Sequence, residues 1–339
     1  MNKKVLITGA EGFIGSHLVE RLVQSGFNVR AHVLYNSFGY NGWLESIDSE
    51  LKDNFEIFYG DIRDPQRIKQ ALNGCDIVLN LAALIAIPYS YHATKSYFDT
   101  NVYGLLNILN AANELSVDQV VHTSTSEVYG SAQYVPIDEK HPLVGQSPYS
   151  ASKISADQLA VSYYRSFETP VKIIRPFNTY GPRQSARAVI PSIITQLLSD
   201  KKAISLGSLT PTRDFNYIQD TVSGYLAIID SQLCFGEVVN IGSGFEVSIQ
   251  ETYEIIASLM SIEKEILSDF DRLRPQKSEV ERLFCDNSKA RKLLNFVPEF
   301  SGKQGFKSGL KRTIDWFSNS ENTAKYNSDI YNIWSVQSF

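Results

Sequence analysis

The chain has 339 residues, of which 43% are hydrophobic and 20% are charged, and its formal net charge is −5 at pH 7. These values are ordinary for a soluble globular protein and exclude a disordered or fibrous chain. The negative net charge argues against nucleic acid as a partner. Because one hydrophobic core rarely serves more than about 250–300 residues, we expect a large domain with a second, smaller lobe.

The cysteines and histidines show no pattern typical of a disulfide framework or a metal site. Cys75, Cys234 and Cys285 lie far apart and form no C-x-x-C pair, and the five histidines lack metal-ligand spacing. We therefore expect no metal and a reducing, cytoplasmic environment. The most apolar stretch, 77–87, is interrupted by Asn80 and is too short to span a bilayer, so no membrane partner is expected.

Apolar runs of strand length alternate with helical patterns over the first half of the chain. The predicted strands are 5–7, 29–34, 55–59, 77–81, 120–123 and 171–175. The predicted helices are 14–25, 65–72, 97–115 and 150–167. Such alternation, with strands that are apolar throughout, indicates a parallel sheet covered on both faces. The sequence thus predicts an α/β fold, a Rossmann-type doubly wound parallel sheet with a smaller C-terminal substrate-binding lobe.

The pattern becomes irregular after about residue 177, where the predicted helices are 188–199, 220–229 and 248–260. We expect residues 1–176 to form the Rossmann domain, with segments at about 212–242 returning to it. Residues 177–317 would form mainly the substrate-binding lobe. Residues 318–339, which are rich in Asn and Ser but contain several aromatic side chains, are expected to form a C-terminal arm that packs against another part of the molecule.

Three glycines follow the first predicted strand, in the sequence Gly9-Ala-Glu-Gly12-Phe-Ile-Gly15. Glycines here allow a tight turn and let backbone N–H groups approach a pyrophosphate at the helix N-terminus. The spacing is one residue longer than the usual dinucleotide fingerprint, but the strand–turn–helix context is the expected one. The loop therefore predicts dinucleotide binding by Gly9, Gly12, Phe13, Ile14 and Gly15.

The second predicted strand leaves the choice between NAD and NADP open. It ends in Leu34-Tyr-Asn-Ser, with neither an acid for the ribose 2′-hydroxyl nor an arginine pair for a 2′-phosphate, and we favour NAD slightly. Asp61 could accept a hydrogen bond from the adenine amino group or could cap the next helix. The remaining predicted cofactor-binding residues are Asn36, Ser37, Asp61, Ile62, Leu81, Ala82, Ala83, Thr123, Tyr149, Lys153 and Pro176.

Tyr149 and Lys153 are candidates for the catalytic pair. They are four residues apart at the start of a predicted helix and therefore share one helix face. A nearby ammonium, together with the positive nicotinamide, would lower the pKa of the phenol towards neutrality. The phenolate could then accept a hydroxyl proton while hydride leaves the same carbon. Thr125, at the end of the fifth predicted strand, could hydrogen-bond the same substrate oxygen.

The chain resembles the extended short-chain dehydrogenase/reductase family of nucleotide-sugar enzymes, from about residue 3 to beyond residue 316. The motifs that carry the resemblance are the glycine loop, Ser124-Thr-Ser-Glu-Val-Tyr-Gly130, Tyr149/Lys153, Arg175-Pro-Phe-Asn-Thr-Tyr-Gly-Pro-Arg183 and Arg213-Asp-Phe. The resemblance implies oxidation at C4 of a nucleotide sugar, followed by epimerisation, decarboxylation or 4,6-dehydration. It also implies a homodimer in which helices 97–115 and 150–167 form a four-helix bundle with their copies.

Glu127 is the residue on which the choice of reaction depends. Of the three reactions, only 4,6-dehydration requires a carboxylate close to C5 and C6, and Glu127 follows Thr125 by two positions. The Thr-Ser-Glu triplet is the form seen in GDP-mannose 4,6-dehydratases, although the longer string also resembles UDP-glucuronate decarboxylases. The pKa of Ser126 is too high for it to protonate a leaving hydroxide. Either Glu127 serves as base and then acid, or Ser126 relays a proton.

A nucleoside diphosphate requires cations and amides, and the planar fork of arginine suits a diphosphate. Candidates are Asn178, Arg183, Arg187 and Arg213, of which Asn178 and Arg213 fit the family motifs best. The stretch 274–286 is similar to a C-terminal element of GDP-mannose dehydratases, which implies that Arg274 contacts the diphosphate and Glu279 the ribose. The predicted substrate-binding residues are Glu127, Asn178, Arg187, Val189, Arg213, Arg274 and Glu279.

A narrower resemblance comes from residues 35–44, Tyr-Asn-Ser-Phe-Gly-Tyr-Asn-Gly-Trp-Leu, together with 274–286. Both look like the NAD-dependent 4,6-dehydratases of legionaminic-acid biosynthesis. We therefore expect an NDP-N-acetylglucosamine 4,6-dehydratase, with GDP favoured over UDP. The alternatives are a UDP-glucuronate decarboxylase, a nucleotide-sugar 4-epimerase and a catalytically silent NAD(P)-binding regulator, and the intact Thr125, Tyr149 and Lys153 argue against the last.

Overall fold

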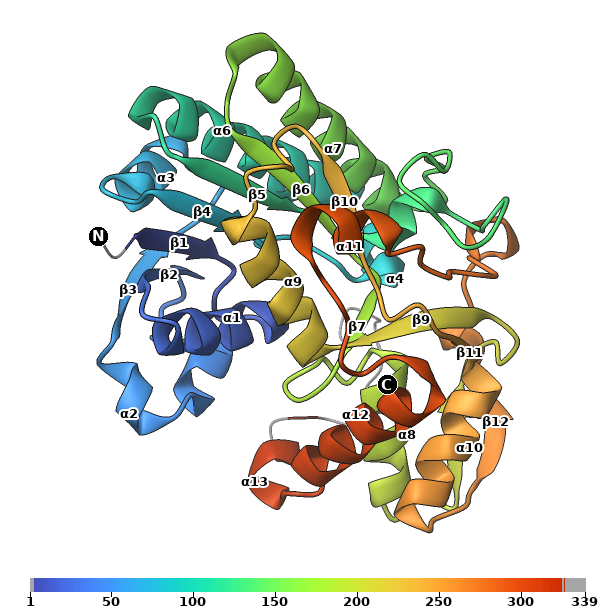
Figure 1. Cartoon of the computed structure of the whole chain (residues 1–339). Helices are drawn as coiled ribbons and strands as arrows, with labels where there is room; N and C mark the ends of the chain where they lie inside the picture. Colours follow the sequence, from blue (N-terminus) through green and yellow to red (C-terminus); the bar gives the residue numbers. More distant parts are fainter. Residues whose placement is uncertain (1–2, 325, 327–339) are drawn as a thin grey trace.

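The computed structural model describes residues 3–324 and 326, and a seven-stranded parallel sheet lies at its centre (Figure 1). The strands follow the order β10-β6-β5-β4-β1-β2-β3, so the chain winds outwards in both directions from β1 and β4. This confirms the predicted doubly wound Rossmann-type fold. The strands are β1 (Lys4–Thr8), β2 (Asn28–Leu34), β3 (Phe55–Gly60), β4 (Ile77–Asn80), β5 (Gln119–Thr123), β6 (Val171–Pro176) and β10 (Val238–Ile241).

Helices cover both faces of this sheet (Figure 1). Side chains along β1 alternate between the two faces, as they must in a strand. Leu6 packs in the hydrophobic cluster that includes Ile108, whereas Val5 and Ile7 pack in the cluster that includes Leu18. The helices on the first face are α3 (Pro65–Leu72), α6 (Gly104–Leu115) and α7 (Pro148–Phe167), and those on the second are α1 (Phe13–Gln24) and α9 (Ile218–Asp230).

The loops after β1 and β4 are joined at the point where the strand order reverses. The Thr8 hydroxyl donates to Asn80 Oδ1 at 2.8 Å and accepts the N–H groups of Leu81 and Ala82 at 3.2 and 3.1 Å. Both loops are therefore fixed at the carboxyl ends of the strands, which is where ligands bind in open α/β sheets.

The long helix predicted over 97–115 is interrupted in the structure. It consists of α5 (Thr94–Phe98), a π-helical turn over Asp99–Tyr103 and α6. The wider turn directs the buried Asn101 inwards, where its amide exchanges hydrogen bonds with the backbone of Leu84 and donates to Ser152 Oγ at 3.0 Å. A uniform 3.6-residue pattern does not reveal such a turn, which here holds the loop after β4.

The second lobe contains short strands and a long helix that the sequence pattern did not predict. β7 and β11 have three residues each and are too short to show alternation. Within 212–242, β10 joins the main sheet, whereas β9 pairs with β7 in a separate sheet. The lobe's elements are β7 (Asn178–Tyr180), α8 (Val189–Leu198), β8 (Ala203–Leu206), β9 (Thr212–Tyr217), β11 (Glu246–Ser248), α10 (Ile249–Met260), β12 (Glu265–Ser268) and α12 (Gly302–Phe317).

An ion pair joins the lobe to the main sheet's helices. The Arg183 guanidinium donates to both carboxylate oxygens of Glu20 on α1, at 2.8 and 2.9 Å. Arg183 also lines the larger cavity, and its Nε is buried without a hydrogen-bond partner among the described residues. Its candidacy as a diphosphate ligand therefore stays a prediction. The smaller helices are α2 (Ser49–Lys52), α4 (Ile87–Ser90), α11 (Ser288–Leu294) and α13 (Ser320–Thr323).

The start of the predicted C-terminal arm contacts both the Rossmann domain and the smaller lobe. Tyr326 donates its hydroxyl to the carbonyl of Gln184 at 2.9 Å, and its ring lies 5.7 Å from that of Trp43. Residue 325 and residues 327–339 of the arm lie outside the described residues. Among the helices that the structure describes, none combines the length and the apolar character needed to cross a bilayer.

Candidate active site

The glycine loop has a geometry that side chains would prevent. Gly9 has φ +67°, and a Cβ added there would lie 2.9 Å from the backbone of Ala82. A Cβ on Gly15 would lie 2.2 Å from the carbonyl oxygen of Gly9. The loop therefore brings the N-terminus of α1 against the switch point without intervening side chains, which is the arrangement that accepts a pyrophosphate.

This loop borders a cavity of about 910 Å³ at the carboxyl ends of the parallel strands. That volume lies in the range typical of cofactor sites, roughly 300–1,000 Å³. The predicted cofactor residues that line it are Gly9, Gly12, Phe13, Ile14, Gly15, Asp61, Ile62, Leu81, Ala82, Ala83, Thr123, Tyr149, Lys153 and Pro176.

Asn36 and Ser37 do not line the cavity, although they were predicted to bind the cofactor. The Asn36 amide instead closes its own loop, donating to the carbonyl of Tyr40 at 2.7 Å and accepting its N–H at 3.1 Å. Loop closure of this kind is a common use of asparagine and turns the side chain away from the crevice. Asp61 lines the cavity and accepts hydrogen bonds from the Arg63 guanidinium, which lowers the pKa of its carboxyl.

The five predicted catalytic residues, Thr125, Ser126, Glu127, Tyr149 and Lys153, all line this cavity. Thr125 caps a 3₁₀ turn over Ser126–Tyr129, and its Oγ1 accepts the N–H of Glu127 at 3.2 Å. The turn places Glu127 directly beyond the end of β5. Tyr149 lies in the first turn of α7, which begins with a Ser147–Ser150 capping box.

Burial dominates the electrostatics of the tyrosine–lysine pair. It lowers the pKa of Lys153 to about 8, although the neighbouring Asp157 carboxylate raises it. Burial also raises the pKa of Tyr149. A hydrogen bond with Thr125 lowers the Tyr149 pKa, and the negative Glu127 carboxylate raises it further. The expected lowering of the tyrosine pKa is therefore absent from the protein alone. The Lys153 ammonium instead donates a hydrogen bond to the Thr123 carbonyl oxygen at 2.5 Å.

A buried polar network lies behind Lys153 and was missed by the sequence analysis. The Asp157 carboxylate accepts hydrogen bonds from Ser124 Oγ and Arg175 Nη2, both at 2.7 Å. His122 Nε2 lies 3.5 Å from its other oxygen. Asp157 follows Lys153 by four residues, so the spacing Tyr149, Lys153, Asp157 was the available signal for one helix face.

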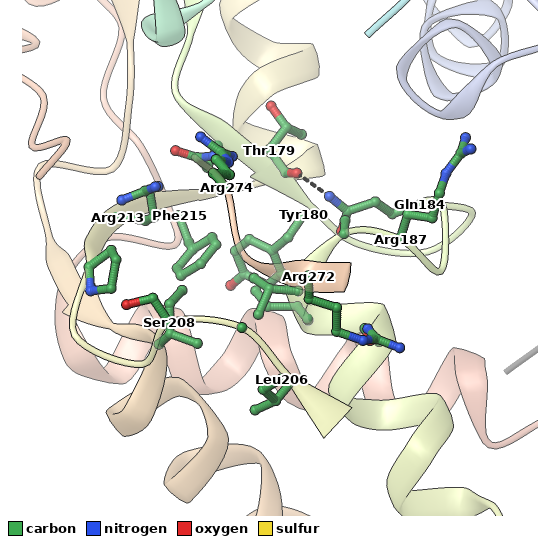
Figure 2. Close-up of a pocket in the computed structure, with 18 of the residues that line it drawn as sticks. Thr179, Tyr180, Gln184, Arg187, Leu206, Ser208, Arg213, Phe215, Arg272 and Arg274 are labelled. Atoms are coloured by element: carbon green, nitrogen blue, oxygen red, sulfur yellow. Dashed lines mark hydrogen bonds between the residues drawn. The ribbon is translucent and has the colours of Figure 1, made fainter. Parts of the chain in front are cut away.

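A second cavity of about 310 Å³ lies beside the first and is formed by the smaller lobe (Figure 2). Asn178, Arg187, Arg272 and Arg274 line both cavities. Arg272 was missed, although it stands two residues before Arg274. The predicted substrate-binding residues that line the second cavity are Asn178, Arg187, Val189, Arg213, Arg274 and Glu279.

Three of the ion pairs around the second cavity are long. Arg274 Nη1 lies 3.4 Å from Glu127 Oε2 and 4.0 Å from Glu279 Oε1, and Arg213 Nη2 lies 3.5 Å from Glu279 Oε1. In Figure 2, Arg213 and Arg274 lie on one side of the cavity and Arg187 on the other. Asn178 Oδ1 is buried and has no hydrogen-bond partner among the described residues. A polar, anionic ligand would complete these interactions.

A glycine loop at a Rossmann switch point, with a tyrosine–lysine pair in the same cavity, defines an enzyme of the short-chain dehydrogenase type. The family model described as GDP-mannose 4,6 dehydratase matches residues 6–309. The chain therefore belongs to this nucleotide-sugar dehydratase family.

Relatives of the chain catalyse more than one reaction. It is 31% identical to a putative UDP-glucose 4-epimerase of Methanocaldococcus jannaschii, over 94% of this chain and 100% of that protein. It is 33% identical to a UDP-N-acetyl-α-D-glucosaminuronate decarboxylase of Bacillus cytotoxicus, over 95% and 100%. The crystal structure of a dTDP-glucose 4,6-dehydratase from Streptomyces venezuelae, with NAD bound, has a TM-score of 0.83 at 30% identity and covers 95% of this chain and 98% of that one.

Proposed function

We propose that the protein is an NAD-dependent NDP-N-acetylglucosamine 4,6-dehydratase, with GDP favoured over UDP as the nucleotide. Its product would be a 4-keto-6-deoxy nucleotide sugar for legionaminic-acid or other surface-glycan biosynthesis. The observation that carries this proposal is the position of Glu127, whose carboxylate shares one cavity with Tyr149, Lys153 and Thr125. Among the reactions of the family's relatives, dehydration is the one that uses a carboxylate at C5 and C6.

The residues around the larger cavity fit NAD. The crowded contacts of Gly9 and Gly15 leave backbone groups at the N-terminus of α1 to hold the pyrophosphate. NAD, when bound, accepts a hydride and returns it in the same turnover. The NAD in the solved dehydratase and in solved UDP-glucuronic acid 4-epimerase supports NAD as the cofactor here.

Tyr149 would act as the base for the C4 hydroxyl. Its phenol hydrogen-bonds with Thr125, which would orient the same substrate oxygen. With a pKa of about 8, Lys153 is largely protonated at pH 7, and its ammonium would stabilise the phenolate. Tyr149 thus requires a bound cofactor and a protonated Lys153 to overcome the effect of burial on its pKa.

Glu127 would remove the C5 proton and then protonate the hydroxyl that leaves C6. Ser126, which is buried beside it, is the alternative relay for that second proton.

The smaller cavity would hold the nucleoside diphosphate. Arginines on two sides suit the diphosphate, since each can donate bidentately. Glu279 would accept from the ribose, the unpartnered Asn178 Oδ1 would accept from a substrate hydroxyl or amide, and Val189 would contact the nucleoside. The resemblance of residues 35–44 and 274–286 to legionaminic-acid dehydratases supports N-acetylglucosamine as the sugar.

A decarboxylase is the second candidate, because Arg274 could hold a substrate carboxylate in place of its contact with Glu127. Mass spectrometry of the product separates the two reactions. We would offer GDP-GlcNAc, UDP-GlcNAc and UDP-glucuronate separately to the purified protein with NAD. Loss of water from a GlcNAc nucleotide, abolished in Glu127→Gln, is the expected result. Loss of CO₂ from UDP-glucuronate, with both GlcNAc nucleotides unchanged, would refute the dehydratase.

We also propose that the protein is a homodimer in which α6 and α7 form a four-helix bundle with their copies. Tyr164 and Phe167 on α7 and Tyr103 just before α6 are exposed in the single chain. Symmetric dimers are the commonest oligomers, and aromatic side chains are enriched at their interfaces. Light scattering of the purified protein should give twice the mass of the chain, and a monomer would contradict the proposal.

A further inference from the structure

The glycine loop carries an acidic side chain that the proposed mechanism does not use. Glu11 lines the larger cavity, and its Oε1 accepts the N–H of Leu34, the last residue of β2, at 3.0 Å. Its Oε2 is buried and has no hydrogen-bond partner among the described residues. A buried carboxylate oxygen without a partner typically costs at least 1–3 kcal/mol, so this atom requires an explanation.

The position of Glu11 is fixed by the chain around it. The Trp43 N–H donates to the Glu11 carbonyl at 2.9 Å. Gly42 approaches so closely that a Cβ there would lie 2.5 Å from that carbonyl oxygen. Burial raises the pKa of the Glu11 carboxyl, and the Leu34 N–H opposes this. The carboxyl is therefore held at the end of β2 with one oxygen satisfied and the other available to a ligand.

The end of β2 is the place where Rossmann proteins recognise the adenosine ribose. There, an acid that follows β2 usually accepts a hydrogen bond from the ribose 2′-hydroxyl. In this chain Tyr35, Asn36 and Ser37 follow Leu34, and none of them is acidic. Glu11 brings a carboxylate to the same strand end from the loop after the neighbouring strand β1.

The other titratable groups at this end of the cavity do not offer a site for a 2′-phosphate. The Arg63 side chain is bound to the Asp61 carboxylate, with Nε at 3.0 Å and Nη2 at 2.5 Å. His32 also lines the cavity, and burial lowers its pKa to about 4, so the ring is neutral at pH 7. The 2′-phosphate of NADP would therefore lie beside the negative Glu11 carboxylate. Neither Arg63 nor His32 would offer it a positive charge, because Arg63 is bound to Asp61 and His32 is neutral.

We propose that Glu11 accepts the 2′-hydroxyl of the adenosine ribose and excludes a 2′-phosphate, which makes the protein specific for NAD over NADP. The assignment rests on the proposed function only in that the protein must bind a nicotinamide dinucleotide. It places the specificity determinant inside the glycine loop instead of after β2.

Calorimetric titration of the nucleotide-free protein with NAD and with NADP tests this proposal. We expect the wild type to bind NAD at least about 100-fold more tightly than NADP. Glu11→Gln should weaken NAD binding about 10-fold, since a charge-assisted hydrogen bond is replaced by a neutral one, and should narrow the NAD/NADP ratio by a similar factor. Glu11→Asp keeps the charge and should retain discrimination against NADP. Glu50→Gln, an exposed substitution on α2, is the matched control and should change neither affinity.

Thermal unfolding of each variant without nucleotide shows whether it is folded before it is titrated. If folded Glu11→Gln and the wild type have the same ratio of NAD affinity to NADP affinity, Glu11 does not determine the specificity. That result would leave the proposed cofactor unaffected. A wild type that prefers NADP would also overturn the role of Glu11, and with it the NAD dependence of the proposed enzyme, but not the dehydration reaction. A wild type that binds neither dinucleotide would overturn the proposed cofactor and this inference together.

Discussion

The two ends of the active site are built differently. Behind Lys153, donors and acceptors meet at ordinary hydrogen-bond distances, as in the 2.7 Å contacts of Asp157 with Ser124 and Arg175. Around the smaller cavity, Arg274 and its acidic neighbours lie 3.4–4.0 Å apart. At the catalytic end most donors and acceptors are thus paired within the protein, although Asp157 Oδ1 and His122 Nε2 have no hydrogen-bond partner among the described residues. At the substrate end the ion pairs of Arg274 are long enough for a ligand to replace them.

The scaffold explains this difference. The proposed catalytic residues stand at the ends of buried strands and on α7, a 20-residue helix. Arg274 and Glu279 lie on irregular chain between β12 and α11. Groups on regular elements are positioned before substrate arrives, while groups on loops can adjust to it. Substitutions at the two ends should therefore have different kinetic signatures.

The largest effect is expected at the catalytic end. Tyr149→Phe should lower kcat by about 10²- to 10⁴-fold, because the general base is lost while the binding residues remain. Glu127→Gln should lower product formation by a similar factor but should still reduce the bound NAD, which is visible as absorbance at 340 nm. Tyr163→Phe, which removes only a hydroxyl bonded to Asn110, serves as the control. Full dehydratase activity in Glu127→Gln would refute its role.

The stability of the protein should depend on pH through three buried histidines. Burial lowers the pKa values of His17, His32 and His122 to about 4, so the unfolded chain binds more protons between pH 6.5 and 4. The free energy of unfolding should therefore fall as the pH falls, by at most about 1.4 kcal/mol per pH unit for each histidine.

Asp214 acts in the opposite direction, because burial raises its pKa to about 6 and its native carboxyl takes up a proton before the unfolded one does. The free energy of unfolding should therefore decrease between pH 6.5 and 4, but by less than the three histidines would cause without Asp214. Urea unfolding at pH 7, 6 and 5 measures the net slope. A stability that rises steadily towards pH 5 would contradict the neutral, buried histidines.

At the substrate end, Arg274→Gln should raise KM about 10-fold, because a diphosphate contact made in the ground state is lost. Arg274→Lys should recover only part of this affinity, since lysine cannot donate bidentately. Arg282→Gln, which breaks an exposed ion pair with Glu246, is the matched control. An unchanged KM in Arg274→Gln would place the diphosphate elsewhere.

A smaller effect should connect the network to catalysis. If Lys153 acts as an ammonium, as proposed, kcat should decline as the pH rises above about 8, because burial lowers the pKa of Lys153 to about 8. The Asp157 carboxylate raises that pKa, so Asp157→Asn should move the decline to lower pH. Asp157→Glu should restore it in part. A pH profile that is identical in Asp157→Asn and the wild type would limit Asp157 to a structural role.

The sequence predicted those parts that depend on local pattern. The parallel sheet follows from apolar strands alternating with helices, and Tyr149 and Lys153 share a face because helix geometry requires it. The sequence did not reveal Asp157's network, because its partners come from β5 and β6 and meet only in the tertiary structure. The three-residue strands and the π turn carry no distinct period. Glu11 was overlooked because an acid was sought only after β2.

The contact between Trp43 and Tyr326 has a consequence for biosynthesis. The indole of Trp43 lines the larger cavity and packs against Trp316 and Tyr326, at 5.6 and 5.7 Å between ring centroids. Translation proceeds from the N-terminus, so the ribosome completes the glycine loop long before it adds the residues that support this wall. A nascent chain should therefore complete this wall of the cavity only after residues 316 and 326 have been added, when the strands of the sheet have already been synthesised.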